Sequence, residues 1–129
     1  MRVLRLSATV MFSLLLYGMF GGLVSAHHST AGYDLKKQIT LRGVVVEYRW
    51  RNPHVYIVWD VKDESGTVVR WTGCLSSVTT MMQDGMSKNS LKMGDEIILT
   101  VNPLKNGNPL ATILKISTVD GKPILAGPQ

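Results

Sequence analysis

The stretch ITLRGVVVEYRW, residues 39–50, has the pattern of one long β-strand that changes face part-way along. Ile39 and Leu41 share one face of this strand, ahead of Gly43. Beyond the glycine the apolar side chains fall on the alternate positions, at Val44, Val46, Tyr48 and Trp50. A change of phase at a glycine is typical of a β-bulge, which bends a strand. We therefore expect this strand to serve two sides of a curled sheet.

The rest of the chain carries further strand patterns and one helix pattern. Alternation of apolar and polar residues, bounded by turn-forming stretches, predicts strands. These strands are expected over His54–Val61, Thr67–Cys74, Glu96–Val101 and Leu110–Val119, with the tail Lys122–Gln129 as a candidate edge strand. Ser76–Asp84 is predicted to be a helix, because Val78, Met81 and Met82 share its face and a serine can cap its start.

This order of elements predicts the fold class. Three strands, one helix and two strands match the OB-fold, a small five-stranded barrel that is partly open. We therefore expect an all-β domain with one short helix, an OB-fold-like barrel over residues 39–129. A different small barrel or a β-sandwich is the alternative.

The N-terminus has the three parts of a secretory signal peptide. Two arginines lie within the first five residues, an apolar stretch follows over Leu6–Phe20, and the small residues Val24-Ser25-Ala26 offer a cleavage site. The apolar stretch is shorter than the roughly 20 residues that span a bilayer. We expect residues 1–26 to be removed, residues 27–38 to form an arm, and the mature protein to be periplasmic or secreted without a stable membrane anchor.

Charge and cysteine content narrow the function classes. Loss of residues 1–26 lowers the net charge from +5 to +3, which is not the dense basic patch of a nucleic-acid-binding protein. Cys74 is the only cysteine, so the domain has no internal disulfide, and we expect its side chain to be a small buried apolar group. The chain has no nucleophile elbow, phosphate-binding loop or metal-binding cysteine pair.

The three histidines suggest a metal site. Cleavage after Ala26 makes His27 the first residue, whose α-amine and imidazole can chelate one ion, and His54 would add a third nitrogen. This arrangement, called a histidine brace, favours Cu(II). Cleavage after Ser25 would instead place His28 third, and a third-position histidine also binds Cu(II). The alternative is that His27 and His28 are merely solvated and that His54 caps a strand edge.

A second cluster predicts a ligand groove. In an OB-fold the loop between the first two strands and the loop between the last two flank the usual ligand groove. These loops are predicted at Arg51–Pro53 and Asn102–Pro109. An anionic or cyclic ligand could stack there on aromatic and arginine side chains. The candidate groove residues are Tyr48, Arg49, Trp50, Arg51, Asn52 and Tyr56. Alternatively, Tyr48 and Trp50 pack in the barrel and the arginines are solvated.

Several motifs also resemble a known family. They are Ala26-His27-His28-Ser29, Tyr33-Asp34, Trp50-Arg51-Asn52-Pro53-His54 and the run Ser90–Glu96. Together they resemble the small exported bacterial proteins of domain-of-unknown-function family 6152. The resemblance implies a periplasmic or secreted domain with one small β-barrel, and it implies no activity. Arg51 and Cys74 depart from the residue types that we expect in this family at those positions.

We therefore interpret the chain as an exported small binding domain that binds copper through its N-terminus. We expect a binding protein rather than an enzyme. Its expected partner is a small ligand or an envelope protein, and nucleic acid is not expected. Two alternatives stay open. One is an envelope interaction or accessory module without a metal, and the other is a copper-dependent oxidase.

Overall fold

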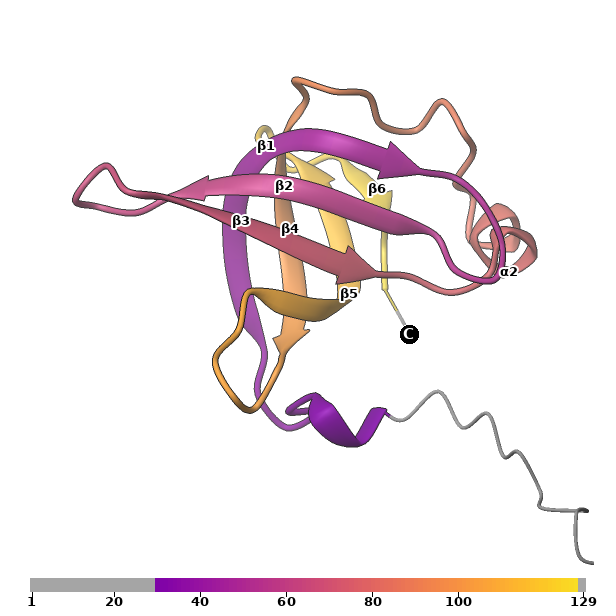
Figure 1. Ribbon diagram of the computed structural model, residues 1–129. Helices are drawn as coiled ribbons and strands as arrows, with labels where there is room; N and C mark the ends of the chain where they lie inside the picture. The colour runs from indigo at the N-terminus through magenta and orange to yellow at the C-terminus, as the bar shows by residue number, and fades with distance from the viewer. Residues whose placement is uncertain (1–29, 128–129) are drawn as a thin grey trace, which may run out of the picture.

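The computed structural model describes residues 30–127, and these form a barrel with one short helix (Figure 1). The predicted signal peptide, residues 1–26, lies outside the described residues. The elements are the 3-10 turn η1 and six strands, with the helix between β3 and β4: η1 Thr30–Gly32, β1 Ile39–Arg49, β2 Tyr56–Lys62, β3 Val68–Cys74, α2 Val78–Gln83, β4 Glu96–Pro103, β5 Leu110–Thr118 and β6 Pro123–Leu125.

Five strands close the barrel. The hydrogen-bonded order is β3-β2-β1-β4-β5-β6, and β3 also pairs with β5 in parallel. This pairing joins Thr72–Cys74 to Leu110–Thr112 and completes the ring. The predicted OB-fold-like barrel is confirmed, and the tail contributes β6 as a short edge strand beside β5.

The long first strand serves two sides of the barrel, as its pattern predicts. Its first half, from Ile39 to Val44, pairs with β4, and its second half, from Val44 to Arg49, pairs with β2. Gly43 lies at the bend, where a Cβ atom would collide with the Asp60 carbonyl oxygen and would lie 2.7 Å from Trp59 Cδ1. Position 43 therefore requires glycine, because β2 approaches too closely for any side chain to fit.

The position of the bulge differs from the prediction. The register between β1 and β2 shifts between Val45 and Glu47, three residues beyond Gly43. Val45 is buried, with 1% of its surface exposed, whereas Val44 is 43% exposed. The inward face thus continues through Gly43 to Val45, and the extra residue is Val46. Three consecutive valines hide this shift in the sequence, because any of them suits the core.

Element ends also differ from the prediction by one or two residues. β2 begins at Tyr56, so His54 belongs to the preceding loop, and β4 continues to Pro103. The helix is shorter than predicted, with Ser77 as its N-cap, whose hydroxyl accepts from Thr80 N at 3.2 Å. Gly85 follows the helix with a φ of +85°, the left-handed conformation in which helices commonly end.

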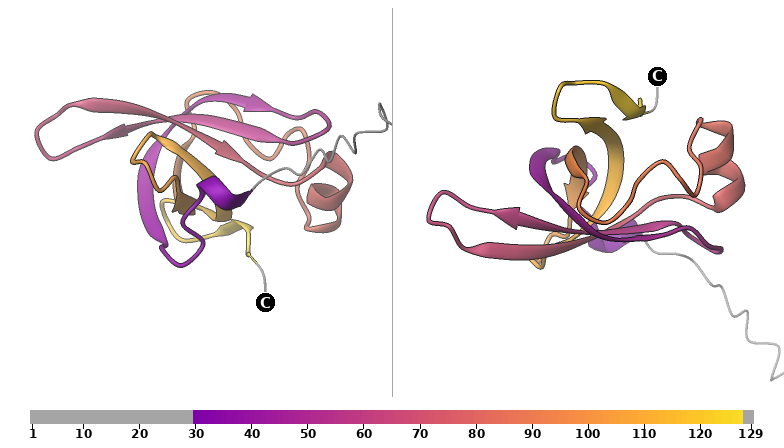
Figure 2. Two further views of the ribbon diagram at one scale, coloured as in Figure 1. Left: turned by 60° about the horizontal axis from the view of Figure 1, so that its bottom comes forward. Right: turned by 90° about the horizontal axis from the view of Figure 1, so that it is seen from above.

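The core fills the barrel with aliphatic side chains around Trp59. Large side chains with less than 2% exposure come from β1, β2, β4 and β5, together with Val55 just before β2: Val45, Val55, Ile57, Trp59, Ile97, Leu99, Val101 and Ile116. The β2–β3 hairpin projects from one side of this barrel, and α2 lies at the opposite side (Figure 2). Within residues 30–127, no helix is long and apolar enough to cross a membrane.

Candidate functional site

His54, a candidate metal ligand, is held in a fixed orientation. It follows the Arg51–Pro53 turn and is partly buried. Its Nδ1 atom lies 3.2 Å from the carbonyl oxygen of Leu75. A carbonyl oxygen only accepts, so Nδ1 carries the proton and Nε2 is the basic nitrogen of the neutral ring. The ring also meets the ring of Tyr56 edge-on, with centroids 6.4 Å apart and planes at 84°.

Cys74 shares the same carbonyl group with His54. Its Sγ atom donates to the Leu75 oxygen at 3.2 Å. In the β2–β3 register Cys74 is directly opposite Tyr56, so the two side chains share one face of the sheet. Cys74 is partly exposed, which corrects the expectation of a small buried apolar group. The sequence contains no local pattern that joins His54 to Cys74; the strand register brings them together.

The environment keeps both acidic groups of this cluster protonated. Burial raises the pKa of the Cys74 thiol, and a hydrogen bond with Tyr56 opposes this shift. The same hydrogen bond, followed by burial, raises the pKa of the Tyr56 hydroxyl. At neutral pH the site therefore presents a thiol and a phenol rather than two anions.

The N-terminal arm lies against the β4–β5 loop, beneath the barrel in Figure 1. Asp34 N donates to Pro103 O at 2.8 Å, and Lys105 N donates to Gly32 O at 3.0 Å. The buried side chain of Asn102 donates to Lys37 O at 2.7 Å. These contacts tie both ends of the described arm to the barrel.

Tyr33 connects the arm to the cluster. Its backbone forms an isolated bridge with Leu104. Burial, and then the neighbouring charge of Cys74 when ionised, raise the pKa of Tyr33. The arm therefore brings Tyr33 within electrostatic range of the Cys74 thiol, a proximity that the sequence analysis did not predict. No sequence signal could have found it, because it depends on the path of the arm across the loop.

The predicted metal ligands are only partly within the described chain. His54 lies in the cluster, whereas His27 and His28 lie outside the described residues, the nearest of which is Thr30. Among residues 30–127, no three His, Cys, Asp or Glu side chains gather closely enough to hold a metal ion. His54 and Cys74 are the two such side chains that share the Leu75 carbonyl.

The candidate groove residues have several different environments. Tyr48 and Trp50 pack against the core, with ring centroids 5.8 Å apart, and the Tyr48 hydroxyl donates to Ser87 O at 3.0 Å. Burial raises the pKa of Tyr48. Arg49 pairs with Glu47, its Nη2 atom 2.8 Å from Oε2, and Arg51 is exposed.

Asn52 has a structural contact within the predicted groove. Its Oδ1 atom accepts from Val78 N at 3.1 Å, at the start of α2. The β1–β2 loop thereby holds the helix N-terminus. Of the six groove residues, Tyr56 alone takes part in the contacts around His54 and Cys74 described above.

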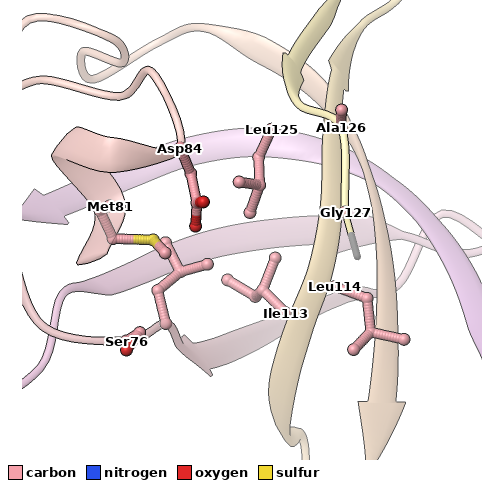
Figure 3. Close-up of a pocket in the computed structure, with 9 residues that line it drawn as sticks. Ser76, Met81, Asp84, Ile113, Leu114, Leu125, Ala126 and Gly127 are labelled. Atoms are coloured by element: carbon pink, nitrogen blue, oxygen red, sulfur yellow. The ribbon is translucent and has the colours of Figure 1, made fainter. Parts of the chain in front are cut away.

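A cavity of about 570 Å³ lies between α2, β5 and β6, and Leu75 and Ser76 also line it (Figure 3). Its lining includes Met81 and Asp84 from the helix side, with Ile113 from β5 and Leu125 from β6. None of the six groove residues lines this cavity. Met81, Ile113 and Leu125 in this lining belong to the barrel core, whereas Ser76 and Asp84 make part of it polar.

The comparison with known families identifies the chain's relatives. The pattern of the family of unknown function DUF6152 matches residues 19–113. The chain belongs to this family. The match covers η1, β1 to β4 and the helix, and ends within β5, so it includes the whole His54–Cys74 cluster. No curated protein and no solved structure matches the chain.

Proposed function

We propose that the mature protein is an exported binding domain that holds one copper ion through three nitrogen atoms. Two of them are the α-amine and the imidazole of His27, which becomes the first residue when the signal peptide is cut after Ala26. The third is Nε2 of His54. A planar or tetragonal set of nitrogen donors favours Cu(II).

The observation that carries this proposal is the 3.2 Å contact between His54 Nδ1 and the Leu75 carbonyl oxygen. Histidines that bind metals commonly donate their other ring N–H to a carbonyl or carboxylate, which fixes the tautomer and orients the ring. His54 already has this arrangement. Its partner oxygen belongs to the backbone of a buried residue, so the ring is held by the barrel itself.

The arm limits how far His27 can reach. Tyr33 lies within electrostatic range of Cys74, whose thiol shares a carbonyl oxygen with His54. The chain from Thr30 onward is held by η1 and by the hydrogen bonds of Gly32 and Asp34, so only residues 27–29 precede the fixed part of the arm. An extended chain of that length spans about 10 Å, so His27 must reach His54 within this span for the site to form.

Copper titration of protein purified from the periplasm tests the proposal, once N-terminal sequencing has established the first residue. We expect one Cu(II) ion per chain. His27→Ala and His54→Ala should each weaken binding at least about tenfold. His28→Ala is the matched control, because its side chain is not a ligand in this site, and it should bind as the unmodified protein does.

Three results would argue against the proposal. Binding no tighter than that of the denatured chain would exclude a built site. Full binding by His54→Ala would exclude the third nitrogen. If the first residue is Ala26 and His28→Ala weakens copper binding, the ion is instead bound by an N-terminus with His28 at the third position. Oxygen consumption by the copper-loaded protein with a reductant would favour the copper-dependent oxidase over a binding domain.

A further inference from the structure

A nitrogen donor and a sulfur donor meet at one backbone oxygen in this protein. His54 Nδ1 and Cys74 Sγ each lie 3.2 Å from the carbonyl oxygen of Leu75. The copper site proposed above uses the other ring nitrogen of His54 and leaves Cys74 without a role. The pair is therefore a second set of potential ligands, drawn entirely from the described part of the chain.

The barrel backbone holds these two donors together. Leu75 N donates to Val55 O at 2.8 Å, and Val55 N donates to Ser76 O at 3.0 Å, which continues the β2–β3 pairing past the strand ends. Val55 and Leu75 are both buried, with 0% and 6% exposure. His54 and Cys74 are the chain neighbours of these two anchors, so their positions are set by the core rather than by a flexible loop.

The strand registers place two further side-chain oxygen atoms on the face of the sheet that carries Cys74. Tyr56 lies opposite Cys74 in the β2–β3 register, and Thr112 lies opposite it in the β3–β5 register. Cross-strand partners share one face of a sheet. Among the described residues, the Thr112 Oγ1 atom is buried and makes no hydrogen bond. The thiol thus has an unsatisfied polar atom on its own face of the barrel.

The chemistry of the donors selects the ion. Thiolate sulfur is a soft ligand that favours Cu(I), Zn²⁺ or iron–sulfur clusters. Structural zinc requires four ligands, and this pair supplies two side chains with a carbonyl oxygen nearby. Cu(I) accepts lower coordination than zinc does. A nitrogen and a thiolate in adjacent positions are therefore better suited to Cu(I).

We propose that His54 Nδ1 and Cys74 Sγ together bind one Cu(I) ion, in competition with the binding of Cu(II) at Nε2. This inference rests on the proposed function only for the competition, because its own ligands do not include the N-terminal amine. The thiol releases its proton to solvent as the sulfur–copper bond forms. The Nδ1 proton moves to Nε2, and neither group is oxidised or reduced.

The competition follows from the two ring nitrogens of His54. In the described structure the proton is on Nδ1, which leaves Nε2 as the donor for Cu(II). Binding of Cu(I) at Nδ1 shifts that proton to Nε2 and removes the donor. One histidine would thus report the oxidation state of the bound copper through its tautomer.

Proton release makes Cu(I) affinity depend on pH. His54 shares a carbonyl oxygen with the thiol, and Tyr56 lies opposite it in the β2–β3 register. Because the thiol gives up one proton for each ion that it binds, Cu(I) affinity should rise with pH.

The test is an anaerobic Cu(I) competition titration with a chromophoric chelator, on protein processed in the periplasm. Cys74→Ser should lower Cu(I) affinity at least about 100-fold, because the soft ligand is lost. Its Cu(II) affinity should stay within about threefold, because the thiol is not a ligand in that site. The double variant Thr72→Cys with Cys74→Ser is the matched control, since it moves the thiol two residues along the same face of β3 without changing the thiol count.

The outcomes separate this inference from the proposed function. His27→Ala should lose Cu(II) and keep Cu(I), whereas His54→Gln should lose both. Unchanged Cu(I) affinity in Cys74→Ser, or recovery of that affinity in the double variant, would overturn the inference. Nitrogen-15 NMR gives a measurement that needs no variant: on addition of Cu(I), the His54 proton should move from Nδ1 to Nε2, and retention of the Nδ1 proton would also overturn it.

Discussion

The Nδ1 atom of His54 lies 3.2 Å from the carbonyl oxygen of Leu75, which joins the β1–β2 loop to the residue just after β3. This contact spans 21 residues of sequence. It decides which ring nitrogen of His54 carries the proton, and it does so before any ligand arrives. The consequences for tautomer, thiol reactivity and stability can each be measured.

The first prediction concerns the His54 tautomer. Because the Leu75 oxygen accepts a hydrogen bond from Nδ1, the neutral ring should carry its proton on Nδ1, although free histidine prefers Nε2. Nitrogen-15 chemical shifts of the metal-free protein measure this directly. A ring protonated on Nε2 would contradict the prediction. A denatured sample supplies the reference for the unconstrained ring.

The second prediction concerns the pH dependence of Cys74 reactivity. Burial raises the pKa of the thiol, so the rate of alkylation should rise at higher pH than for a free cysteine. The hydrogen bond with Tyr56 lowers that pKa, so Tyr56→Phe should move the profile to still higher pH. Rates of iodoacetamide modification between neutral and alkaline pH test both statements. A Tyr56→Phe profile displaced to lower pH would refute them.

The third prediction concerns Gly43. A methyl group at this position would meet the Asp60 carbonyl and Trp59 Cδ1, and neither can move without shifting β2. We expect Gly43→Ala to lower the free energy of unfolding by about 1–3 kcal/mol, the range for overpacked sites. Urea denaturation measures this loss. Thr40→Ala, an exposed position on the same strand, is the control, and equal stability of the two variants would show that the bend tolerates a side chain.

The fourth prediction concerns the contact between Asn52 and the helix. The Asn52 Oδ1 atom accepts from Val78 N, which satisfies one of the unpaired amides at the start of α2. Asn52→Ala should therefore cost about 1 kcal/mol of stability, as loss of a helix cap does. Asn52→Asp should retain most of it, because a carboxylate also accepts. Asn89→Ala, at an exposed position, should have little effect on the midpoint of denaturation.

The fifth prediction concerns the arm. Buried Asn102 donates to Lys37 O at 2.7 Å, and its replacement by alanine leaves this carbonyl without its partner. We expect a loss of about 1–2 kcal/mol and faster cleavage by trypsin after Lys36 or Lys37. Limited proteolysis followed by mass spectrometry measures the cleavage. Asn108→Ala, in the exposed loop after β4, should be cut at the unmodified rate; equal rates for both variants would show that Asn102 does not hold the arm.

The barrel could be predicted from the sequence because the patterns that indicate its strands and its helix are local. Alternation along each strand, the serine before the helix and the glycine in β1 each act within a few residues. The shift in register at Val46 was placed wrongly at Gly43, because Val44, Val45 and Val46 are equally apolar and only pairing with β2 distinguishes them. The glycine is needed for a different reason, the close approach of Asp60.

The candidate site was less predictable because its contacts are distant in sequence. His54 was identified by its residue type, but its contact with Leu75 depends on how β2 and β3 pair beyond their ends. The same pairing places Tyr56 opposite Cys74. Tyr33 comes within electrostatic range of Cys74 only because the arm pairs with the β4–β5 loop at Leu104. The proposed roles of His27 and His28 stay predictions, because both lie outside the described residues.

The closing seam of the barrel has its own consequence. Within the described residues, three residue pairs join β3 to β5, whereas seven join β3 to β2. Segments held by few backbone hydrogen bonds open before the rest of a domain unfolds. The barrel should therefore unroll first along this line and free the edge of β3 at Thr72, Gly73 and Cys74. An uncovered strand edge invites pairing with another chain, so the risk of aggregation lies where the barrel closes.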